Sequence, residues 1–287
     1  MEKFPKVFVI ILNYNGGELL KKCLAGVFKQ DYPNFEVVLV DNDSRDGSFE
    51  SAKSNFSKAH FIKNEANLGF SAGNNIGIRF ALERMARHVL LLNNDTEVEK
   101  DFLSKLIEAA EKDDAIGIAS PVIFNGHSRQ VWFSGGKIDW LRMKAVNEQT
   151  IRTVDAYETD FITGCAMLVK AEVFKKAGLL DEDFFLYWED VDFSQRAKKA
   201  GFRNIIVAGS WVYHFEKSEG NLENKTYWLV VSGMLFFKKN ATAMLKVWLS
   251  GYMILRKIKN RLDIVFNRNK SAPVVRKAYN DFKNAKF

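Results

Sequence analysis

Short apolar runs alternate with amphipathic stretches along the first 120 residues of the chain. Three runs are rich in β-branched or aliphatic residues and are followed by Asn or Asp: Val7–Leu12, Phe35–Val40 and Val89–Leu92. Continuous apolar runs of this length are typical of parallel strands buried on both faces. A helical period of apolar positions follows over Gly17–Lys29, Phe70–Met85 and Lys100–Lys112. We therefore predict an α/β, Rossmann-like fold with a mostly parallel central sheet, whose ligands bind at the carboxyl ends of the strands.

The pattern is weaker after this region. Ala119–Tyr157 contains a Gly135-Gly136 turn, and we predict further strands there with a loop that covers the site. Asn204–Ala208 is typical of another strand, and Val212–His214 of its irregular continuation.

The C-terminal region has a different pattern from about Tyr227 onward. Aliphatic and aromatic positions precede Lys238-Lys239, and a second apolar stretch leads into Arg256 and Lys257. This pattern predicts amphipathic helices with interfacial aromatics and basic edges, which can lie on an anionic membrane. A helical hairpin packed on the rest of the chain, or a dimer contact, would show the same pattern. The sequence leaves these alternatives open.

Charge is distributed unevenly between two predicted parts, residues 1–224 and residues 225–287. The second part carries 14 Lys/Arg against 2 Asp/Glu, a net charge of +12. The whole chain carries +7, so the first part carries −5. This asymmetry favours an anionic surface as the partner of the tail. It argues against a nucleic-acid binder, because the basic residues are interleaved with Leu, Met and Trp.

The two cysteines, Cys23 and Cys165, are far apart and lack the spacing of a metal site. We expect reduced core residues in a protein on the cytoplasmic side. The N-terminal apolar run ends at polar Asn13 without a small-residue cleavage site, so we expect a first strand and not a signal peptide. No apolar segment is long enough for a membrane span.

The densest acidic cluster follows the aromatic pair Tyr187-Trp188. Glu189, Asp190 and Asp192 fall in the first turn of a predicted helix, where negative charge is favourable. One carboxylate would be enough for a helix cap, and three repel one another. The excess indicates proton transfer or cation binding.

Two further polar clusters follow predicted strands. Asp41 and Asn42 follow the second strand, where a carboxylate can accept hydrogen bonds from a ribose or a base. Asn93, Asn94 and Asp95 follow a fully apolar strand, and Asp95 is placed to hold a divalent cation between two phosphates. An ordinary turn is the competing interpretation of each segment.

A third segment, Asn67–Asn75, contains Gly69 and Asn74 at the start of a predicted helix. Its glycines could let the backbone approach a nucleotide, although capping of the helix by Ser71 explains it as well. It lacks the glycine patterns of dinucleotide folds and P-loops. Downstream, His214 follows an apolar strand and is either a metal ligand or a buried structural residue.

In this order, the segments resemble glycosyltransferase family 2 of the GT-A fold, closest to its rhamnosyltransferase-like branch. The resemblance covers roughly Lys6 to Gly220. The segments that carry it are VIILNYNGGELLKKCL, VLVDNDSRDGS, NEANLGFSAGNNIGI, LLLNNDTEV, ITGCAMLVKAEVFKKAGLLDEDFFLYWEDVDFSQRAKKAG and VYHFEKSEG.

The resemblance implies a role for individual residues. Asp190 takes the position of the general base, with Glu189 beside it, and Trp188 shapes the acceptor pocket. Asp95 is the last residue of the family's Asp-x-Asp metal motif, and His214 matches a metal-binding histidine of relatives. The implied nucleotide-sugar-binding residues are Asn13, Asp41, Asn42, Asn67, Gly69, Asn74, Asn93, Asn94 and Asp95.

The implied activity is an inverting glycosyl transfer that depends on Mn²⁺ or Mg²⁺. The expected donor is dTDP-rhamnose or a UDP-hexose, and the expected acceptor is a saccharide or a lipid-linked saccharide of bacterial cell-surface polysaccharide synthesis. We expect the protein to act peripherally on the inner face of the cell membrane, without nucleic acid. One departure supports an alternative: Asn93 replaces the first carboxylate of the metal motif, as in a non-catalytic scaffold of polysaccharide assembly.

Overall fold

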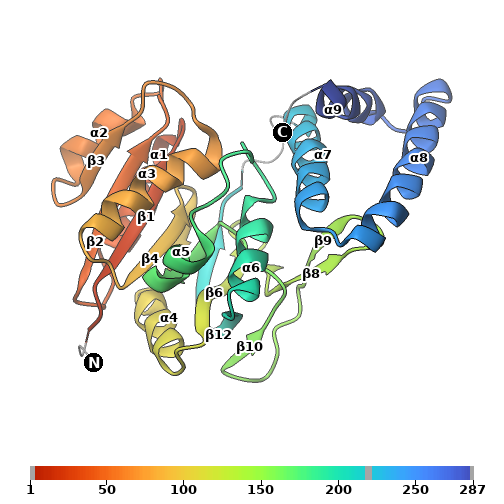
Figure 1. Ribbon diagram of the computed structural model, residues 1–287. Helices are drawn as coiled ribbons and strands as arrows, with labels where there is room; N and C mark the ends of the chain where they lie inside the picture. Colours follow the sequence, from red (N-terminus) through yellow and green to blue (C-terminus); the bar gives the residue numbers. More distant parts are fainter. Residues whose placement is uncertain (1–3, 217–221, 285–287) are drawn as a thin grey trace.

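A computed structural model of the chain describes residues 4–216 and 222–284, so Lys217–Gly220, the end of the last motif, lies outside the described residues. A twisted β-sheet covered by helices forms the body, and helices α7, α8 and α9 lie at one side of it (Figure 1). The predicted α/β fold, with a mostly parallel central sheet and a C-terminal helical extension, is confirmed.

Four parallel strands form one half of the sheet, in the order β4-β1-β2-β3. Their bounds are β1 Val7–Asn13, β2 Phe35–Asp41, β3 His60–Lys63 and β4 His88–Asn93. The helices between them are α1 Gly17–Val27, α2 Ser48–Asn55 and α3 Gly69–Glu83. Asn13 pairs in register with Asp41, so the carboxyl ends of β1 and β2 meet at one edge.

The other half of the sheet contains both strand directions. β11 (Ala166–Lys170) runs antiparallel to β4 and to β6 (Ile116–Asn125). β12 (Arg203–His214) lies parallel to β6, with a register shift between Val207 and Trp211. The predicted strand with an irregular continuation is therefore confirmed. Three short strands complete this half: β5 Thr96–Val98, β7 Val131–Phe133 and β10 Ala156–Glu158.

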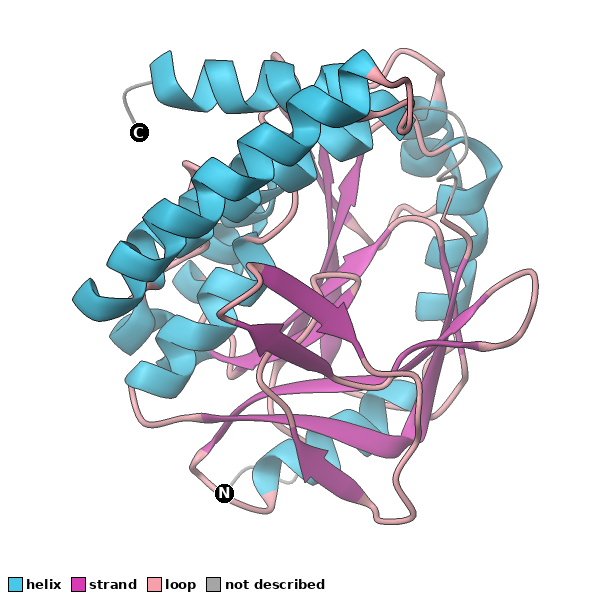
Figure 2. Cartoon of the chain, turned by 90° about the vertical axis from the view of Figure 1, so that its right-hand side faces the viewer, coloured by secondary structure: helices cyan, strands magenta, loops and turns pink. Residues whose placement is uncertain are grey.

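Helices α4 (Phe102–Glu111), α5 (Ala171–Ala177) and α6 (Glu189–Lys199) belong to this second half. A separate hairpin of β8 (Gly136–Asp139) and β9 (Lys144–Asn147) projects on the side that carries α8 (Figure 2). The predicted glycine turn begins it: Gly135 has a φ of +119°, a conformation that favours glycine.

The core forms where the sequence pattern predicts it. Val7–Ile11 in β1 is buried on both faces, because helices cover both sides of the sheet. In α1 the periodic positions point inward: Leu20, Cys23, Leu24 and Val27 are buried. Cys23 and Cys165 are buried and unpaired, as expected for reduced core cysteines.

The C-terminal helices are α7 (Leu222–Asn240), α8 (Ala243–Val265) and α9 (Ala272–Asn284). Phe236 and Phe237 of α7 are buried against Trp188, so this helix packs on the body. Lys239 at its end forms ion pairs with Asp181 and Asp183. For α7, therefore, packing is the alternative that the structure supports.

The predicted boundary between residues 224 and 225 falls in the first turn of α7. The division into two parts stays a prediction. Within the described ranges, no helix combines the length and the apolar character needed to cross a bilayer.

Candidate active site

Polar side chains at the carboxyl ends of β1, β2 and β4 form one buried network. Asn13 Nδ2 donates to Asp41 Oδ1 at 2.7 Å, and Asn13 Oδ1 accepts from Asn94 Nδ2 at 2.9 Å. Asp41 Oδ2 accepts the backbone N–H of Ser44 at 2.9 Å. Asn13 and Asp41 are 0% exposed and hold Asn94, which lines a cavity above them. A contact between Asp41 and a base or ribose stays a prediction.

A second set of polar groups positions the start of α3. Asn42 Nδ2 donates to the Gly69 carbonyl at 2.9 Å, and Asn67 Oδ1 accepts the Gly69 N–H at 2.9 Å. Asn74 Nδ2 donates to a backbone carbonyl one turn earlier in the helix. Gly69 has a φ of +78°, and a Cβ there would lie 2.4 Å from the Phe185 carbonyl oxygen. The atom that closely approaches the Gly69 backbone therefore belongs to the chain itself. Contacts of Asn42, Asn67, Gly69 and Asn74 with a nucleotide stay a prediction.

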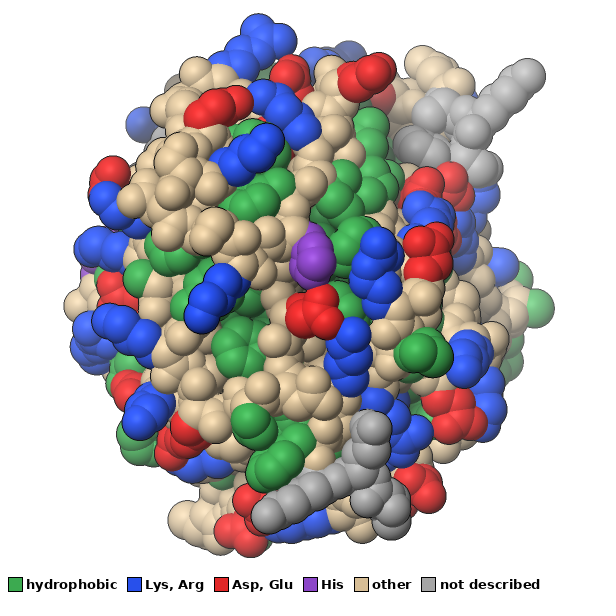
Figure 3. Space-filling view, turned by 90° about the vertical axis from the view of Figure 1, so that its left-hand side faces the viewer, with side chains coloured by type: hydrophobic (Ala, Val, Ile, Leu, Met, Phe, Trp, Pro, Cys, Tyr) green, Lys and Arg blue, Asp and Glu red, His purple; other side chains and the backbone are tan. Residues whose placement is uncertain are grey.

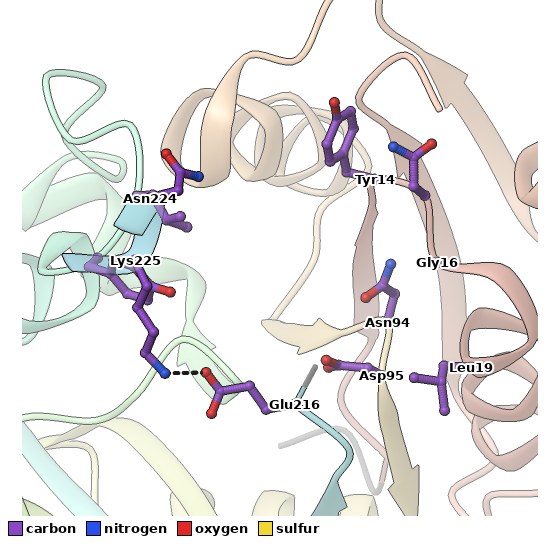
Figure 4. A pocket seen from close by; sticks show the side chains of 11 residues that line it. Tyr14, Gly16, Leu19, Asn94, Asp95, Glu216, Asn224 and Lys225 are labelled. Atoms are coloured by element: carbon purple, nitrogen blue, oxygen red, sulfur yellow. Dashed lines mark hydrogen bonds and ion pairs between the residues drawn. The ribbon is translucent and has the colours of Figure 1, made fainter. Parts of the chain in front are cut away.

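Two adjoining cavities open at this edge of the sheet. The first, of about 310 Å³, has Tyr14, Asn94 and Asp95 on one wall and Glu216 and Lys225 on the other (Figure 4). The second has a volume of about 460 Å³ and contains the acidic end of α6. The residues that line both are Asp95, Leu186, Tyr187, Glu216 and Lys225. The two cavities are therefore continuous, with space for two ligands side by side.

Asp95 and His214 meet where the cavities join. Asp95 Oδ1 lies 3.1 Å from His214 Nε2. The sheet brings them together, because β5 is antiparallel to β12 with Thr96 in register with His214. Burial disfavours the imidazolium, but the Cys165 sulfur and the Asp95 carboxylate outweigh it and raise the pKa of His214 to about 11.

The Asp95–His214 pair fits a divalent cation. Two neighbouring ligands of an octahedral Mg²⁺ or Mn²⁺ lie about 3 Å apart when each bond is about 2.1 Å long. Asp95 Oδ1 is also buried and, apart from its ion pair with His214, has no hydrogen-bond partner within residues 4–216 and 222–284. In the same described ranges, no group of three or more His, Cys, Asp and Glu residues converges on one point. The chain thus offers two ligands, and phosphate or water oxygens would complete the shell.

Two carboxylates in the first turn of α6 are buried in different environments. Asp192 accepts from Arg196 Nε and from Asn240 Nδ2, each at 2.7 Å, and so ties α6 to α7. Glu189 is 4% exposed, and its Oε2 has no hydrogen bond among the described residues. Burial, with the neighbouring Asp190 charge, raises the pKa of Glu189 well above its ordinary value. The raised pKa favours the protonated form of Glu189.

Both Glu189 and Asp190 line the second cavity, and backbone N–H groups orient Asp190 there. Its Oδ2 accepts the Gly164 N–H at 2.9 Å, and its Oδ1 accepts the Val191 N–H at 2.8 Å. Burial raises the pKa of Asp190, while these N–H groups and the Thr163 hydroxyl oppose the shift. The arrangement provides an oriented acceptor for a proton at the cavity wall.

The turn into α6 is strained. Tyr187 and Trp188 have φ values of +65° and +70°, which costs of order 1–3 kcal/mol for each such residue. Tyr187 lines both cavities. Trp188 lies against Phe236 and Phe237 of α7 and borders the second cavity. Its acceptor contact stays a prediction.

The residues of the first cavity that sequence reasoning missed include Tyr14, Glu216 and Lys225. Lys225 Nζ lies 2.6 Å from Glu216 Oε1, across the space from Asp95 (Figure 4). Glu216 could have been found from the sequence, because it lies two residues after His214, a predicted metal ligand. Lys225 was grouped with the basic tail, and only the packing of α7 shows that it faces the site.

Comparison with known proteins identifies the family. The model of glycosyl transferase family 2 matches residues 8–178, more than half of the chain. The chain belongs to glycosyl transferase family 2. The matched span contains Asp41 and Asp95 and ends before Asp190 and His214. The resemblance to the rhamnosyltransferase-like branch is confirmed by relatives at modest identity.

Two relatives and one solved structure illustrate the match. The chain is 31% identical over 278 residues to the low-salt glycan biosynthesis hexosyltransferase Agl10 of Haloferax volcanii, covering 80% of this chain and 85% of the relative. It is 26% identical over 230 residues to N-acetylglucosaminyl-diphospho-decaprenol L-rhamnosyltransferase of Mycobacterium tuberculosis, covering 72% and 75%.

The solved structure is the mannosyltransferase PcManGT from Pyrobaculum calidifontis, in complex with GDP-Man and Mn²⁺. It matches with a TM-score of 0.62 at 18% identity, covering 100% of this chain and 77% of that chain. This likeness shows the fold, and the predicted GT-A fold is confirmed.

Proposed function

We propose that this family 2 glycosyltransferase inverts the anomeric centre of a nucleotide-linked sugar, with Asp190 as general base. The observation that carries the proposal is the position of Asp190, which lines the cavity and is oriented by two backbone N–H groups. Its neighbour Glu189 is buried, and its raised pKa favours the protonated form. One oriented carboxylate supports a single displacement without a covalent sugar–enzyme intermediate.

In the proposed step, an acceptor hydroxyl gives its proton to Asp190 while its oxygen bonds to the anomeric carbon. The bond from that carbon to the donor phosphate oxygen breaks, and the nucleoside diphosphate leaves with the electron pair. Attack opposite the leaving group inverts the configuration. The raised pKa of Asp190 suits a base, because proton transfer is most efficient when the catalytic pKa lies near the working pH.

The other end of the site would bind the donor diphosphate. Asp95 and His214 would hold Mn²⁺ or Mg²⁺, which when bound offsets negative charge on the leaving group. Lys225 supplies positive charge from the opposite wall, where it now pairs with Glu216. Asn93 also lines the cavity, but its amide carries no charge. Asp95 is therefore the carboxylate that the metal motif supplies.

The relatives guide the choice of substrates. One is named a hexosyltransferase and another an L-rhamnosyltransferase of a diphospho-decaprenol-linked sugar. We therefore place dTDP-rhamnose first among donors and UDP-hexoses second. The acceptor would be a saccharide, free or linked to a lipid. A lipid-linked acceptor would bring the enzyme to a membrane surface.

The test is donor binding and hydrolysis with dTDP-rhamnose, UDP-glucose, UDP-galactose and UDP-GlcNAc, with and without Mn²⁺. We expect one donor to be preferred and its turnover to require the metal. Asp95→Ala should raise the Mn²⁺ concentration needed for donor binding at least about tenfold, since it removes one of two protein ligands. An unchanged Mn²⁺ titration would contradict the metal site. Nucleotide binding without turnover of any donor would favour the scaffold.

A further inference from the structure

An apolar stripe runs along the outer side of α8. Eight of its side chains are between 46% and 85% exposed: Met244, Val247, Trp248, Ile254, Leu255, Ile258, Leu262 and Val265. Their spacing of three and four residues places them on one side of the helix over its whole length. Figure 2 shows α8 in front of the body, on the side that faces the viewer. Without a partner, this stripe is covered by water. It is a contiguous apolar patch, whereas the apolar residues on an ordinary protein surface are scattered singly.

The stripe is distinct from the face by which α8 is attached. Leu249 and Asn260 are buried on the inner side, and Asn260 Nδ2 donates to the Ala272 carbonyl at 2.9 Å. Trp248 Nε1 donates to the Leu141 carbonyl at 3.1 Å, at the turn of the β8–β9 hairpin. Leu141 is itself 60% exposed and extends the apolar surface beside Trp248. Trp248 thus anchors one end of the stripe to the hairpin, and the other stripe side chains are exposed on the side opposite Leu249 and Asn260.

The margins of the stripe are basic. Helix α8 carries five basic residues and one acidic residue: Lys246, Arg256, Lys257, Lys259, Arg261 and Asp263. At 3.6 residues per turn, Lys259 and Arg261 fall on opposite sides of the stripe. The single acid, Asp263, already pairs with Lys259 at 3.3 Å. The opposite side of the molecule mixes both signs of charge (Figure 3).

The basic margins of the stripe distinguish two possible partners, a second copy of α8 and an anionic lipid bilayer. A second copy of α8 would place Lys259 and Arg261 next to the same basic residues, because the positions flanking a coiled-coil seam face each other. Gly251 would also lie in that seam without a side chain. Anionic lipid headgroups complement the basic margins, while the stripe enters the interface. We propose that the outer face of α8 docks on an anionic lipid bilayer, with the helix parallel to the membrane plane.

The position of α8 relates this surface to the acceptor side of the site, which rests on the proposed function. Trp188 and Leu229 line the cavity that contains Asp190. They also line an adjoining cavity of about 170 Å³, together with Met143 of the hairpin region and Arg256 of α8. A bilayer held by α8 would lie on the Trp188 side of Asp190. That is the side from which a lipid-linked acceptor would enter.

The test is flotation of the full chain with phosphatidylcholine vesicles, with or without about one third phosphatidylglycerol. We expect binding to the anionic vesicles that weakens with salt. Leu255→Glu with Leu262→Glu should reduce binding at least about tenfold, because two charges enter the stripe. The matched control is Met85→Glu with Val154→Glu, which makes the same charge change at exposed apolar residues outside the C-terminal helices. The control should bind as the unmodified chain does.

A second variant keeps the apolar stripe and inverts its margins. Lys259→Glu with Arg261→Glu should also lose binding to anionic vesicles, while nucleotide binding stays unchanged in every variant. Equal flotation of all variants would overturn the proposal. So would light scattering that shows a dimer which the Leu255→Glu, Leu262→Glu variant converts to a monomer, with flotation unaffected. The flotation assay needs no sugar transfer, so its result can be interpreted even if the proposed enzymatic function is wrong.

Discussion

Glu189 and Asp190 are neighbours in the chain, but their surroundings affect their pKa values differently. Glu189 is buried without a hydrogen-bond partner for Oε2 among the described residues, and burial raises its pKa well above 4.5. Asp190 turns to the cavity and accepts two backbone N–H bonds that favour its charged form. The backbone N–H groups therefore make Asp190 the better candidate for the ionised base.

The first prediction concerns the charge of Asp190. Asp190→Asn should keep donor binding and lower transfer by about 10²–10⁴-fold, because the proton acceptor is lost while the shape is kept. Single-turnover transfer and calorimetric nucleotide binding measure the two effects separately. Glu189→Gln is the matched control and should retain most of the activity, since glutamine resembles the protonated acid. Normal turnover by Asp190→Asn would rule out the base assignment.

The second prediction uses the pH dependence of stability. Glu189 binds its proton more tightly in the folded than in the unfolded state, because its folded pKa is raised above 4.5. Its contribution to the free energy of unfolding is present below pH 4.5 and falls as the pH rises toward the folded pKa. The melting temperature of the unmodified chain should therefore fall relative to Glu189→Gln as the pH rises above about 5. Parallel melting curves for the two proteins would contradict this.

At the scale of elements, one glycine sets how closely α3 approaches the segment before α6. Gly69 has a φ of +78°, and its missing side chain leaves room for the Phe185 carbonyl. The Phe70 N–H donates to that carbonyl at 2.7 Å. The start of α3 and the strained turn at Tyr187 are thereby held together.

The third prediction compares two glycines with nearly equal backbone angles. Gly47 has a φ of +76°, and no atom lies within 4 Å of the place that a Cβ would take, so Gly47→Ala should cost only about 1–2 kcal/mol for the left-handed backbone. Gly69→Ala should cost about 1–3 kcal/mol more, because its Cβ would overlap the Phe185 carbonyl. Urea denaturation followed by circular dichroism measures both. Equal costs would show that the α3 contact yields easily.

At the scale of the whole molecule, α7 belongs to the catalytic body and α8 to its outer surface. Leu235, Phe236 and Phe237 are at most 1% exposed, and Asn240 bonds Asp192 of α6. In α8 the buried residues are Leu249 and Asn260, and most large apolar side chains face water. The basic tail thus contains one helix packed on the body and one whose large apolar side chains are mostly exposed.

The fourth prediction follows from this division. A chain that ends at Thr226 loses α7 and uncovers Trp188, and each large core side chain removed costs about 2–5 kcal/mol. Since a whole domain is stable by only about 5–15 kcal/mol, we expect no cooperative thermal unfolding. A chain that ends at Asn240 keeps α7 and should still melt cooperatively and bind nucleotide. A cooperative melt of the shorter chain near the full-length temperature would contradict the assignment of α7 to the body.

Predictions from the sequence succeeded for elements whose pattern has one interpretation. The strands β1, β2 and β4 have continuous apolar runs, and each is found within about one residue of its predicted bounds. Edge strand β3 was not predicted, because His60 and Lys63 flank only two apolar residues. For α8 the pattern is apolar on two sides, so periodicity could not show which side packs. The burial of Leu249 shows it.

The sequence by itself determined the α/β fold, the family and the polar clusters at the strand ends, because these depend on local period and on motifs read in order. The tertiary structure alone decided that Asp95 meets His214, that backbone N–H groups orient Asp190 at the cavity wall, and that Lys225 closes the opposite wall. These facts depend on strand pairing and helix packing between distant segments. Burial and distance across the fold are created only when the chain closes on itself, and they set charge state and ligand geometry.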